Sequence, residues 1–179
     1  MVALARHGQT AFNAEGRFQG HLPVPLDATG REQARALAAL AAEREWGALW
    51  CSPLARARET ADVVAAAVGL EPRPDPRFAE TDCGDWTGRA FADVVAEDPE
   101  GFEAFVAMRE DFRFPGGESF ADQRARVLRG LEEVRAGALP ALVVCHRGVM
   151  RLALAAAGAA GAGGGPLDIA NASLVDLPA

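Results

Sequence analysis

A histidine beside an arginine follows an apolar run at the start of the chain. Residues 2–5 have the pattern of a short buried strand, and Gly8 ends that strand in a polar turn. Arg6 and His7 therefore stand at the carboxyl end of a predicted strand, which is where open α/β sheets bind ligands. A guanidinium group neutralises an anion, and an imidazole can attack it or transfer protons. The pair predicts a reaction on an anionic substrate.

A second histidine has the same setting near the other end of the chain. The run Ala141–Cys145 is the strongest buried-strand pattern in the sequence, and His146 follows it directly. The carboxyl ends of parallel strands share one edge of a sheet. We therefore expect His7 and His146 to form a two-histidine pocket for a phosphoryl group.

Two further segments place polar groups after predicted strands. Arg56 lies in the first turn of a predicted helix, where free backbone N–H groups and the helix dipole favour an anion. The segment 78–88 carries carboxylates at Glu80, Asp82 and Asp85, any of which could act as a general acid.

Four ordered motifs resemble those of the histidine phosphatase superfamily, the phosphoglycerate mutase-like group in which a histidine is transiently phosphorylated. They are Arg-His-Gly-x-Thr-x-x-Asn at 6–13, Ser-Pro-Leu-x-Arg-Ala-x-x-Thr-Ala at 52–61, Glu-x-x-x-Gly-x-Trp-x-Gly at 80–88, and the strand that ends in His146. In addition, Pro-Gly-Gly-Glu-Ser at 115–119 resembles an element found especially among the phosphatases, although a turn and a helix cap at Ser119 also explain it.

The resemblance implies roles for individual residues. His7 is the implied nucleophile and Glu80 the implied proton donor, while Arg6, Arg56 and His146 would hold the phosphoryl group. The residues expected to bind the substrate are Thr10, Asn13, Gln19, Gly20 and Arg147. The family usually has glycine where this chain has Arg147, which either reaches a distal anion of the substrate or crowds the site.

The implied activity is metal-independent hydrolysis of a small phosphorylated metabolite through a phosphohistidine, as in an α-ribazole phosphatase or a broad-specificity phosphatase. The main alternative is a phosphoglycerate mutase. By resemblance, mutases that depend on a bisphosphate cofactor are longer and carry extra basic residues in an insert. Segment 79–118 of this chain has only Arg89, Arg109 and Arg113, which favours the phosphatase.

Two other hypotheses compete with this one. Cys145 and Arg151 have the spacing of a cysteine-dependent phosphatase loop, in which a thiolate attacks and an arginine holds the phosphate. The other hypothesis is a non-catalytic member that binds phosphorylated ligands, against which the intact set of polar residues argues. Five phenylalanines either line an apolar substrate wall or pack helices together: Phe91, Phe102, Phe105, Phe112 and Phe114.

The amino-acid composition excludes several classes of protein function. The chain has 179 residues, of which 50% are hydrophobic, and this predicts a single globular domain over 1–179. The net charge of −7 argues against nucleic acid as a partner. There is no lysine and no tyrosine, which removes Schiff-base chemistry and a Walker-type lysine.

Three widely spaced cysteines suit a reducing cytoplasm, and we expect the protein to be cytoplasmic. Neither a signal peptide nor a membrane-spanning helix is indicated, so no membrane partner is expected. The three histidines lack metal-ligand spacing, and we expect neither a metal nor another cofactor. A homodimer is left open.

The alternation of strands and helices predicts a three-layer α/β/α sandwich around a mostly parallel sheet, with a phosphoglycerate mutase-like fold. Segment 79–118 is expected to form a helical excursion over the active site. Strands are expected at 2–5, 48–51, 71–78, 141–145 and 172–177. Helices are expected at 30–42 with Thr29 as the cap, from Ser52-Pro53 to 68, and at 90–96, 99–109, 119–135 and 148–157. Loops are expected at 9–30 and 158–166.

Overall fold

A computed structural model describes residues 1–159 and 168–178, and a five-stranded sheet forms its centre. The strands are β1 (Val2–Arg6), β2 (Ala48–Cys51), β3 (Pro72–Pro74), β4 (Ala141–Cys145) and β5 (Leu174–Leu177). Their order is β3-β2-β4-β1-β5, and only β5 runs antiparallel to its neighbour. The predicted α/β fold with a mostly parallel sheet is confirmed.

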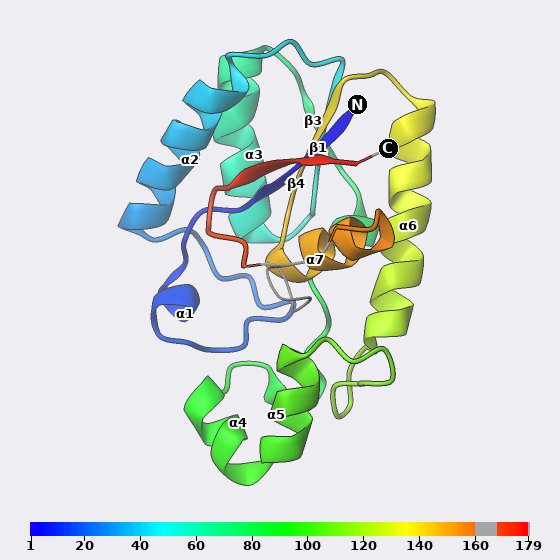
Figure 1. The fold of residues 1–179 in the computed structure, drawn as a ribbon. Helices are drawn as coiled ribbons and strands as arrows, with labels where there is room; N and C mark the ends of the chain where they lie inside the picture. The colour runs from blue at the N-terminus through cyan, green and yellow to red at the C-terminus, as the bar shows by residue number, and fades with distance from the viewer. Residues whose placement is uncertain (160–167, 179) are drawn as a thin grey trace.

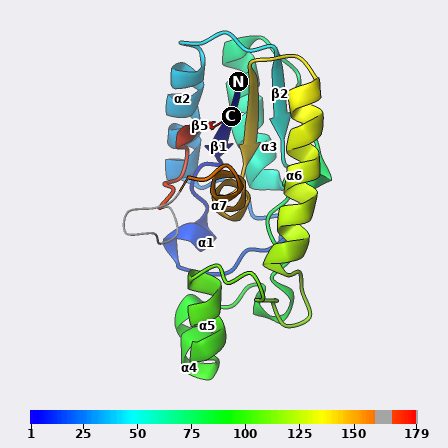
Figure 2. The ribbon, with the colours of Figure 1, turned by 45° about the vertical axis from the view of Figure 1, so that its right-hand side comes forward.

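Helices cover both faces of this sheet (Figure 1). The four that do so are α2 (Ala28–Ala41), α3 (Ala55–Val68), α6 (Phe120–Ala136) and α7 (Arg147–Ala156). Successive side chains of a strand point to opposite faces. Accordingly, Ala3 packs in the core with α2 and α3, whereas Leu4 packs in the core with α6 and α7. Figure 2 shows the sheet between these two layers.

Three shorter helices lie beyond the carboxyl ends of the parallel strands (Figure 1). They are α1 (Ala11–Ala14), α4 (Phe91–Glu97) and α5 (Pro99–Val106). Two 3₁₀ turns, Pro76–Phe78 and Gly84–Trp86, connect β3 to this end of the molecule. None of the helices in residues 1–159 or 168–178 is both long and apolar enough to span a membrane.

Several predicted element boundaries were wrong, including the end of α5, which lies at Val106 instead of 109, and the start of β5, which lies at Leu174 instead of 172. Strand β3 has three residues rather than eight, because Asp75 caps a 3₁₀ turn directly after it. Helix α2 is capped by Asp27 and not by Thr29, since the Asp27 carboxylate accepts a 2.7 Å hydrogen bond from the Gly30 N–H. Helix α3 begins at Ala55 rather than at 52–53.

The loop expected at 9–30 contains a helix that was not predicted. Thr10 and Asn13 form a reciprocal capping box around α1, in which each side chain bonds the backbone N–H of the other residue. The loop expected at 158–166 falls mostly outside the described residues.

Two glycines let the segment after β1 lie against the first turn of α2. A Cβ on Gly30 would lie 1.9 Å from the carbonyl oxygen of Gln9, and one on Gly8 would lie 2.3 Å from the carbonyl oxygen of Gly30. The Gly8 N–H also donates to the hydroxyl of Thr60 at 3.1 Å. These contacts fix the backbone that directly follows His7.

Gly30→Ala should lower the free energy of unfolding by about 1–3 kcal/mol, because the added methyl group would overlap the Gln9 backbone. Urea unfolding followed by circular dichroism measures this change. Gly137→Ala is the matched control, since its Cβ would meet no atom closer than 3.6 Å. Equal effects of the two substitutions would contradict the close approach at Gly30.

Candidate active site

Strands β1 and β4 bring the two predicted histidines together. The strands are parallel neighbours, and the His7 N–H donates to the Cys145 carbonyl oxygen at 3.0 Å. The ring centroids of His7 and His146 lie 5.1 Å apart, with the ring planes at 60°. Both side chains are buried. A single phosphoryl group could therefore contact both imidazoles.

The ring of His7 is held in one tautomer. Its Nδ1 atom lies 2.6 Å from the Gly8 carbonyl oxygen, which can only accept, so Nδ1 carries the proton and Nε2 keeps its lone pair. The pKa of His7 is lowered well below 6.5, chiefly by burial and then by the charges of Arg56 and Arg6. At neutral pH the ring is therefore uncharged, with the lone pair of Nε2 free of the proton.

His146 is held by the hydroxyl group of Ser52. Its Nε2 atom lies 2.7 Å from this hydroxyl, which also accepts a hydrogen bond from the Leu54 N–H. A hydroxyl group can donate one hydrogen bond and accept two, so Ser52 can hold either tautomer of the ring. Burial, followed by the charge of Arg56, lowers the pKa of His146 well below 6.5. The buried Nδ1 atom has no hydrogen-bond partner among the described residues.

Arg6 and Arg56 are buried cations whose charges act on both histidines. Burial lowers the pKa of both guanidinium groups to about 10, so both stay charged at neutral pH. Arg6 donates to the Ile169 carbonyl oxygen at 2.6 Å, and Arg56 donates to the Gly20 carbonyl oxygen at 3.0 Å. Each keeps a buried Nε atom without a partner in the described part of the chain.

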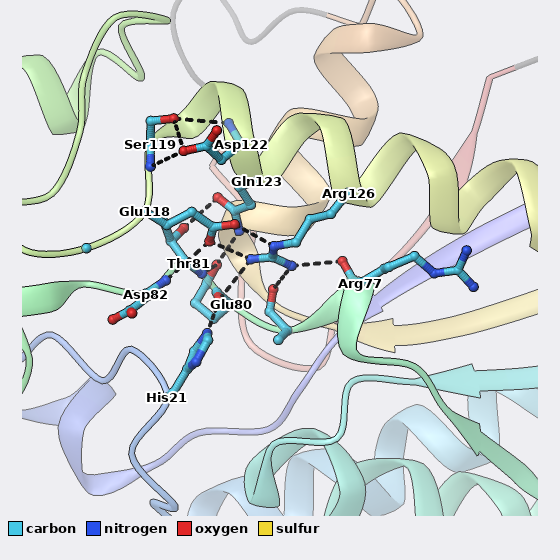
Figure 3. A network of polar contacts seen from close by, with 12 residues as sticks. His21, Arg77, Glu80, Thr81, Asp82, Glu118, Ser119, Asp122, Gln123 and Arg126 are labelled. Atoms are coloured by element: carbon cyan, nitrogen blue, oxygen red, sulfur yellow. Dashed lines mark hydrogen bonds and ion pairs between the residues drawn. The ribbon is translucent and has the colours of Figure 1, made fainter.

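Glu80, drawn with Thr81 and Gln123 in Figure 3, is held at the same site by three N–H donors. Its Oε1 atom accepts from the Thr81 backbone and the Gln123 side chain, both at 3.1 Å, and its Oε2 atom accepts from the Gly148 backbone at 3.2 Å. A Cβ on Gly148 would lie 2.4 Å from Glu80 Oε1. The observed position of the Glu80 carboxylate therefore requires a residue without a side chain at position 148.

A buried ion pair fixes the backbone that carries Glu80. Arg126 and Glu118 form two hydrogen bonds of 2.6 and 2.8 Å, and both side chains are only 16% exposed. Arg126 also donates to the carbonyl oxygens of Arg77, Ala79 and Glu80 (Figure 3). The Pro-Gly-Gly-Glu-Ser turn thus supports Glu80 through Glu118, in addition to the helix cap that Ser119 provides.

Sequence reasoning missed three residues of this arrangement: Ser52, Gln123 and Arg126. Gln123 offered a signal, because it is a polar residue at helical spacing between the apolar Phe120 and Val127. In the structure it is completely buried and bonds both Glu80 and the Thr81 hydroxyl. Ser52 and Arg126 gave no comparable signal, since their partners are distant in the sequence.

Arg6, His7, Arg56 and Glu80 line one cavity of about 90 Å³, whereas the fully buried His146 is not part of its lining. Four of the five residues expected to bind the substrate also line it: Asn13, Gln19, Gly20 and Arg147. Thr10 does not, because its fully buried hydroxyl bonds Asn13 and Gln19 instead. Among the three candidate carboxylates only Glu80 lines the cavity, and Asp82 and Asp85 do not.

One wall of the cavity is apolar. Phe91, Phe105 and Phe114 line it, whereas Phe102 and Phe112 do not and pack within the aromatic cluster beside it. Both uses expected for the phenylalanines therefore occur. Among the described residues, no three His, Cys, Asp or Glu side chains converge closely enough to hold a metal ion.

Cys145 does not reach this cavity, although Arg151 does. Its side chain is completely buried in the core between the sheet and α6 and α7, and burial raises the pKa of its thiol. A nucleophilic thiolate must be both ionised and exposed to substrate. The cysteine-dependent phosphatase hypothesis is therefore wrong.

Comparison with known proteins agrees with this geometry. The sequence pattern of the "Histidine phosphatase superfamily (branch 1)" matches residues 2–178. The chain is 33% identical over 154 residues to the adenosylcobalamin/alpha-ribazole phosphatase of Salmonella typhimurium, with 85% of this chain and 76% of that protein covered. The curated relatives are longer, and the chain covers from 45% to 76% of their length.

Solved structures share the fold. That of mycobacterial glucosyl-3-phosphoglycerate phosphatase in complex with VO3 matches with a TM-score of 0.82 at 34% identity, covering 97% of this chain and 90% of that one. Phosphoglycerate mutase from Thermus thermophilus matches with a TM-score of 0.76 at 34% identity, with the same shares covered. The predicted phosphoglycerate mutase-like fold is confirmed.

The neutral, buried histidines should make stability fall as the pH drops below about 6.5. Because the pKa values of His7 and His146 are lower in the folded state, the unfolded chain binds more protons there. Each histidine should then remove up to about 1.4 kcal/mol per pH unit, until its folded pKa is reached. Urea unfolding at pH 7, 6 and 5 measures the slope. The double variant His7→Gln/His146→Gln should show a shallower slope, and an unchanged slope would contradict buried neutral rings.

Proposed function

The chain belongs to the histidine phosphatase superfamily, and we propose that it hydrolyses a small phosphorylated metabolite through a phosphohistidine intermediate, without a metal. The cavity wall of Phe91, Phe105 and Phe114 suits a substrate with an apolar portion, as in an α-ribazole phosphatase-like or broad-specificity enzyme. Two of the relatives described above carry phosphatase names, which supports hydrolysis as the reaction.

One observation carries this proposal. Buried nitrogen atoms of three residues around the His7 ring lack hydrogen-bond partners among the described residues: Arg6 Nε, Arg56 Nε and His146 Nδ1. An unsatisfied buried donor costs about 1–3 kcal/mol, and a phosphoryl group offers three oxygens that would satisfy them. The site is arranged for the equatorial oxygens of a phosphoryl group under attack.

The reaction proceeds in two steps. His7 Nε2 attacks phosphorus, the phosphorus–oxygen ester bond breaks, and Glu80 gives its proton to the leaving oxygen. Water then attacks the phosphohistidine while Glu80 takes a proton from it. The phosphorus–nitrogen bond breaks, which releases inorganic phosphate and restores neutral His7 and protonated Glu80.

The residues expected to bind the substrate have different roles in this proposal. Asn13, Gln19 and Gly20 border the phosphoryl group, and Arg147 stands at the leaving-group side. Thr10 contributes indirectly, because its hydroxyl positions Asn13 and Gln19.

The arginines of segment 79–118 weigh against a phosphoglycerate mutase. Arg89, Arg109 and Arg113 are each paired with a carboxylate, and none of the three lines the cavity. They leave no basic insert to hold a bisphosphate. The mutase stays the alternative, because one solved structure of this fold is a phosphoglycerate mutase.

The remaining expectations form part of the same proposal. Residues 1–179 act as one domain, with 79–118 covering the active site. The enzyme works in the cytoplasm without a nucleic-acid or membrane partner, which its three free, buried cysteines suit. A homodimer is neither required nor excluded by the site.

His7→Ala should lower turnover about 10⁴-fold or more, because it removes the nucleophile. The assay is phosphate release from a panel of phosphomonoesters without added metal. Cys145→Ala is the control and should keep near wild-type turnover, since that thiol lies in the core. Near wild-type activity of His7→Ala would exclude the mechanism, and tight ligand binding without phosphate release would favour a non-catalytic member.

Glu80→Gln should slow phosphorylation of His7 by alkyl phosphates about 10²–10⁴-fold, but by para-nitrophenyl phosphate much less, because nitrophenolate leaves without a proton. Rapid-quench measurement of phosphohistidine in a single turnover follows this step. Gln123→Leu should change the rates in the same direction by a smaller factor, since it removes one donor to Glu80. An equal loss for both substrates in Glu80→Gln would contradict the role as general acid.

A further inference from the structure

Two arginines of α7 line the cavity but take no part in the proposed phosphoryl transfer. Arg147 begins the helix and Arg151 lies four residues later, so both side chains start from the same face about 6 Å apart along the helix axis. Each is half-buried. Two like charges four residues apart on a helix repel each other, so their shared place on the cavity wall needs a reason.

The charges around this pair are mainly positive. The charge of Arg147 lowers the pKa of Arg6, as does that of Arg151 to a smaller extent, which places three cations close together. Glu80 and Asp168 are the carboxylates that act on this group in the opposite sense. Glu80 is already held by three N–H donors. The wall of the cavity at α7 is therefore suited to an anion.

Of the two side chains, Arg147 makes fewer polar interactions with the rest of the described chain. Its guanidinium group makes no hydrogen bond or ion pair with residues 1–159 or 168–178. The backbone N–H of Gly148, which could otherwise bind an anion at the start of α7, is occupied by Glu80. The phosphoryl oxygens are already served by Arg6, Arg56 and His146. The guanidinium group of Arg147 is therefore available to bind a different part of the substrate.

We propose that Arg147 and Arg151 form a subsite for a second anionic group of the substrate, a carboxylate or a second phosphoryl group. Arg147 directly follows His146 in the chain, so this group lies only a few bonds from the reacting phosphorus. The inference rests on the proposed hydrolase function and adds the substrate class to it: a small phosphomonoester with a second negative charge near the ester. It also assigns a use to the residue that replaces the usual glycine.

Three compounds with the same three-carbon linker test this subsite: 3-hydroxypropyl phosphate, 3-phosphonooxypropanoate and propane-1,3-diyl bisphosphate. The wild-type enzyme should prefer at least one charged compound over the hydroxyl compound by about tenfold in kcat/KM, after the bisphosphate value is halved for its two equal ends. Arg147→Gln should remove that preference, because kcat/KM for the preferred charged compound should fall about tenfold more than kcat/KM for 3-hydroxypropyl phosphate. The two charged compounds show which anion the subsite accepts.

Arg124→Gln is the matched control for charge. Arg124 lies on α6, pairs with Glu110 and does not line the cavity, so its substitution should leave the preference intact. An equal loss in both variants would assign the preference to general electrostatics and overturn the subsite. The subsite is also overturned if the wild-type enzyme shows no preference, or if Arg147→Gln lowers kcat/KM equally for all three compounds.

Binding separates this inference from the hydrolysis itself. Calorimetric titration of the three compounds into His7→Ala, and into His7→Ala/Arg147→Gln, measures the anion preference without turnover. A tenfold preference in affinity that the second variant loses supports the subsite even if the wild-type protein releases no phosphate. Phosphate release with no preference in either assay would overturn the subsite and leave the hydrolase proposal standing.

Discussion

The pairing of β1 with β4 is the constraint on which the site depends. A single backbone hydrogen bond, from the His7 N–H to the Cys145 carbonyl oxygen, sets two residues from opposite ends of the chain at the same height on one sheet edge. Because the strands are parallel, the imidazole that follows each strand projects beyond the same edge. A shift of the register by one residue would turn one histidine to the other face of the sheet. The same pairing contributes to the core, so the fold and the site are stabilised together.

Buried cations and unpaired donors lie around that pairing. Within residues 1–159 and 168–178, Arg6 and Arg56 donate to carbonyl oxygens and form no ion pair with a carboxylate, so part of each charged guanidinium group stays unsatisfied. These unpaired donors lower the free energy of unfolding, because burying a donor without a hydrogen-bond partner is unfavourable. In contrast, Arg126 is fully used by Glu118 and three carbonyl oxygens. In the proposed function, this difference separates the arginines that bind the phosphoryl group from one that stabilises the fold.

The features that could be predicted from the sequence are those that local patterns determine. The strands at 48–51 and 141–145 were predicted at their observed bounds, because a short apolar run between turn residues has few other structures available. The predicted start of a helix was wrong where two nearby residues could both cap it, as at α2, which Asp27 caps. Ser52 and Arg126 could not be found, because their roles arise from contacts across 94 positions with His146 and across 46 with Glu80. Only the folded chain makes such contacts.

The two ends of the cavity are built in physically different ways. The groups that would bind the phosphoryl group in the proposed reaction come from β1, α3 and the turn after β4, and they are buried and fixed by backbone contacts. Groups at the leaving-group end are half-buried arginines of α7 and phenylalanines near α4 and α5, which sit at the edge of the sheet framework. Substitutions at the first end alter every substrate alike, because all phosphomonoesters present the same phosphoryl group. Substitutions at the second end change which ester is held without disturbing the reacting atoms. A fold of this kind can therefore keep one reaction while its substrate changes, which fits the different substrates named for its relatives at 33–34% identity.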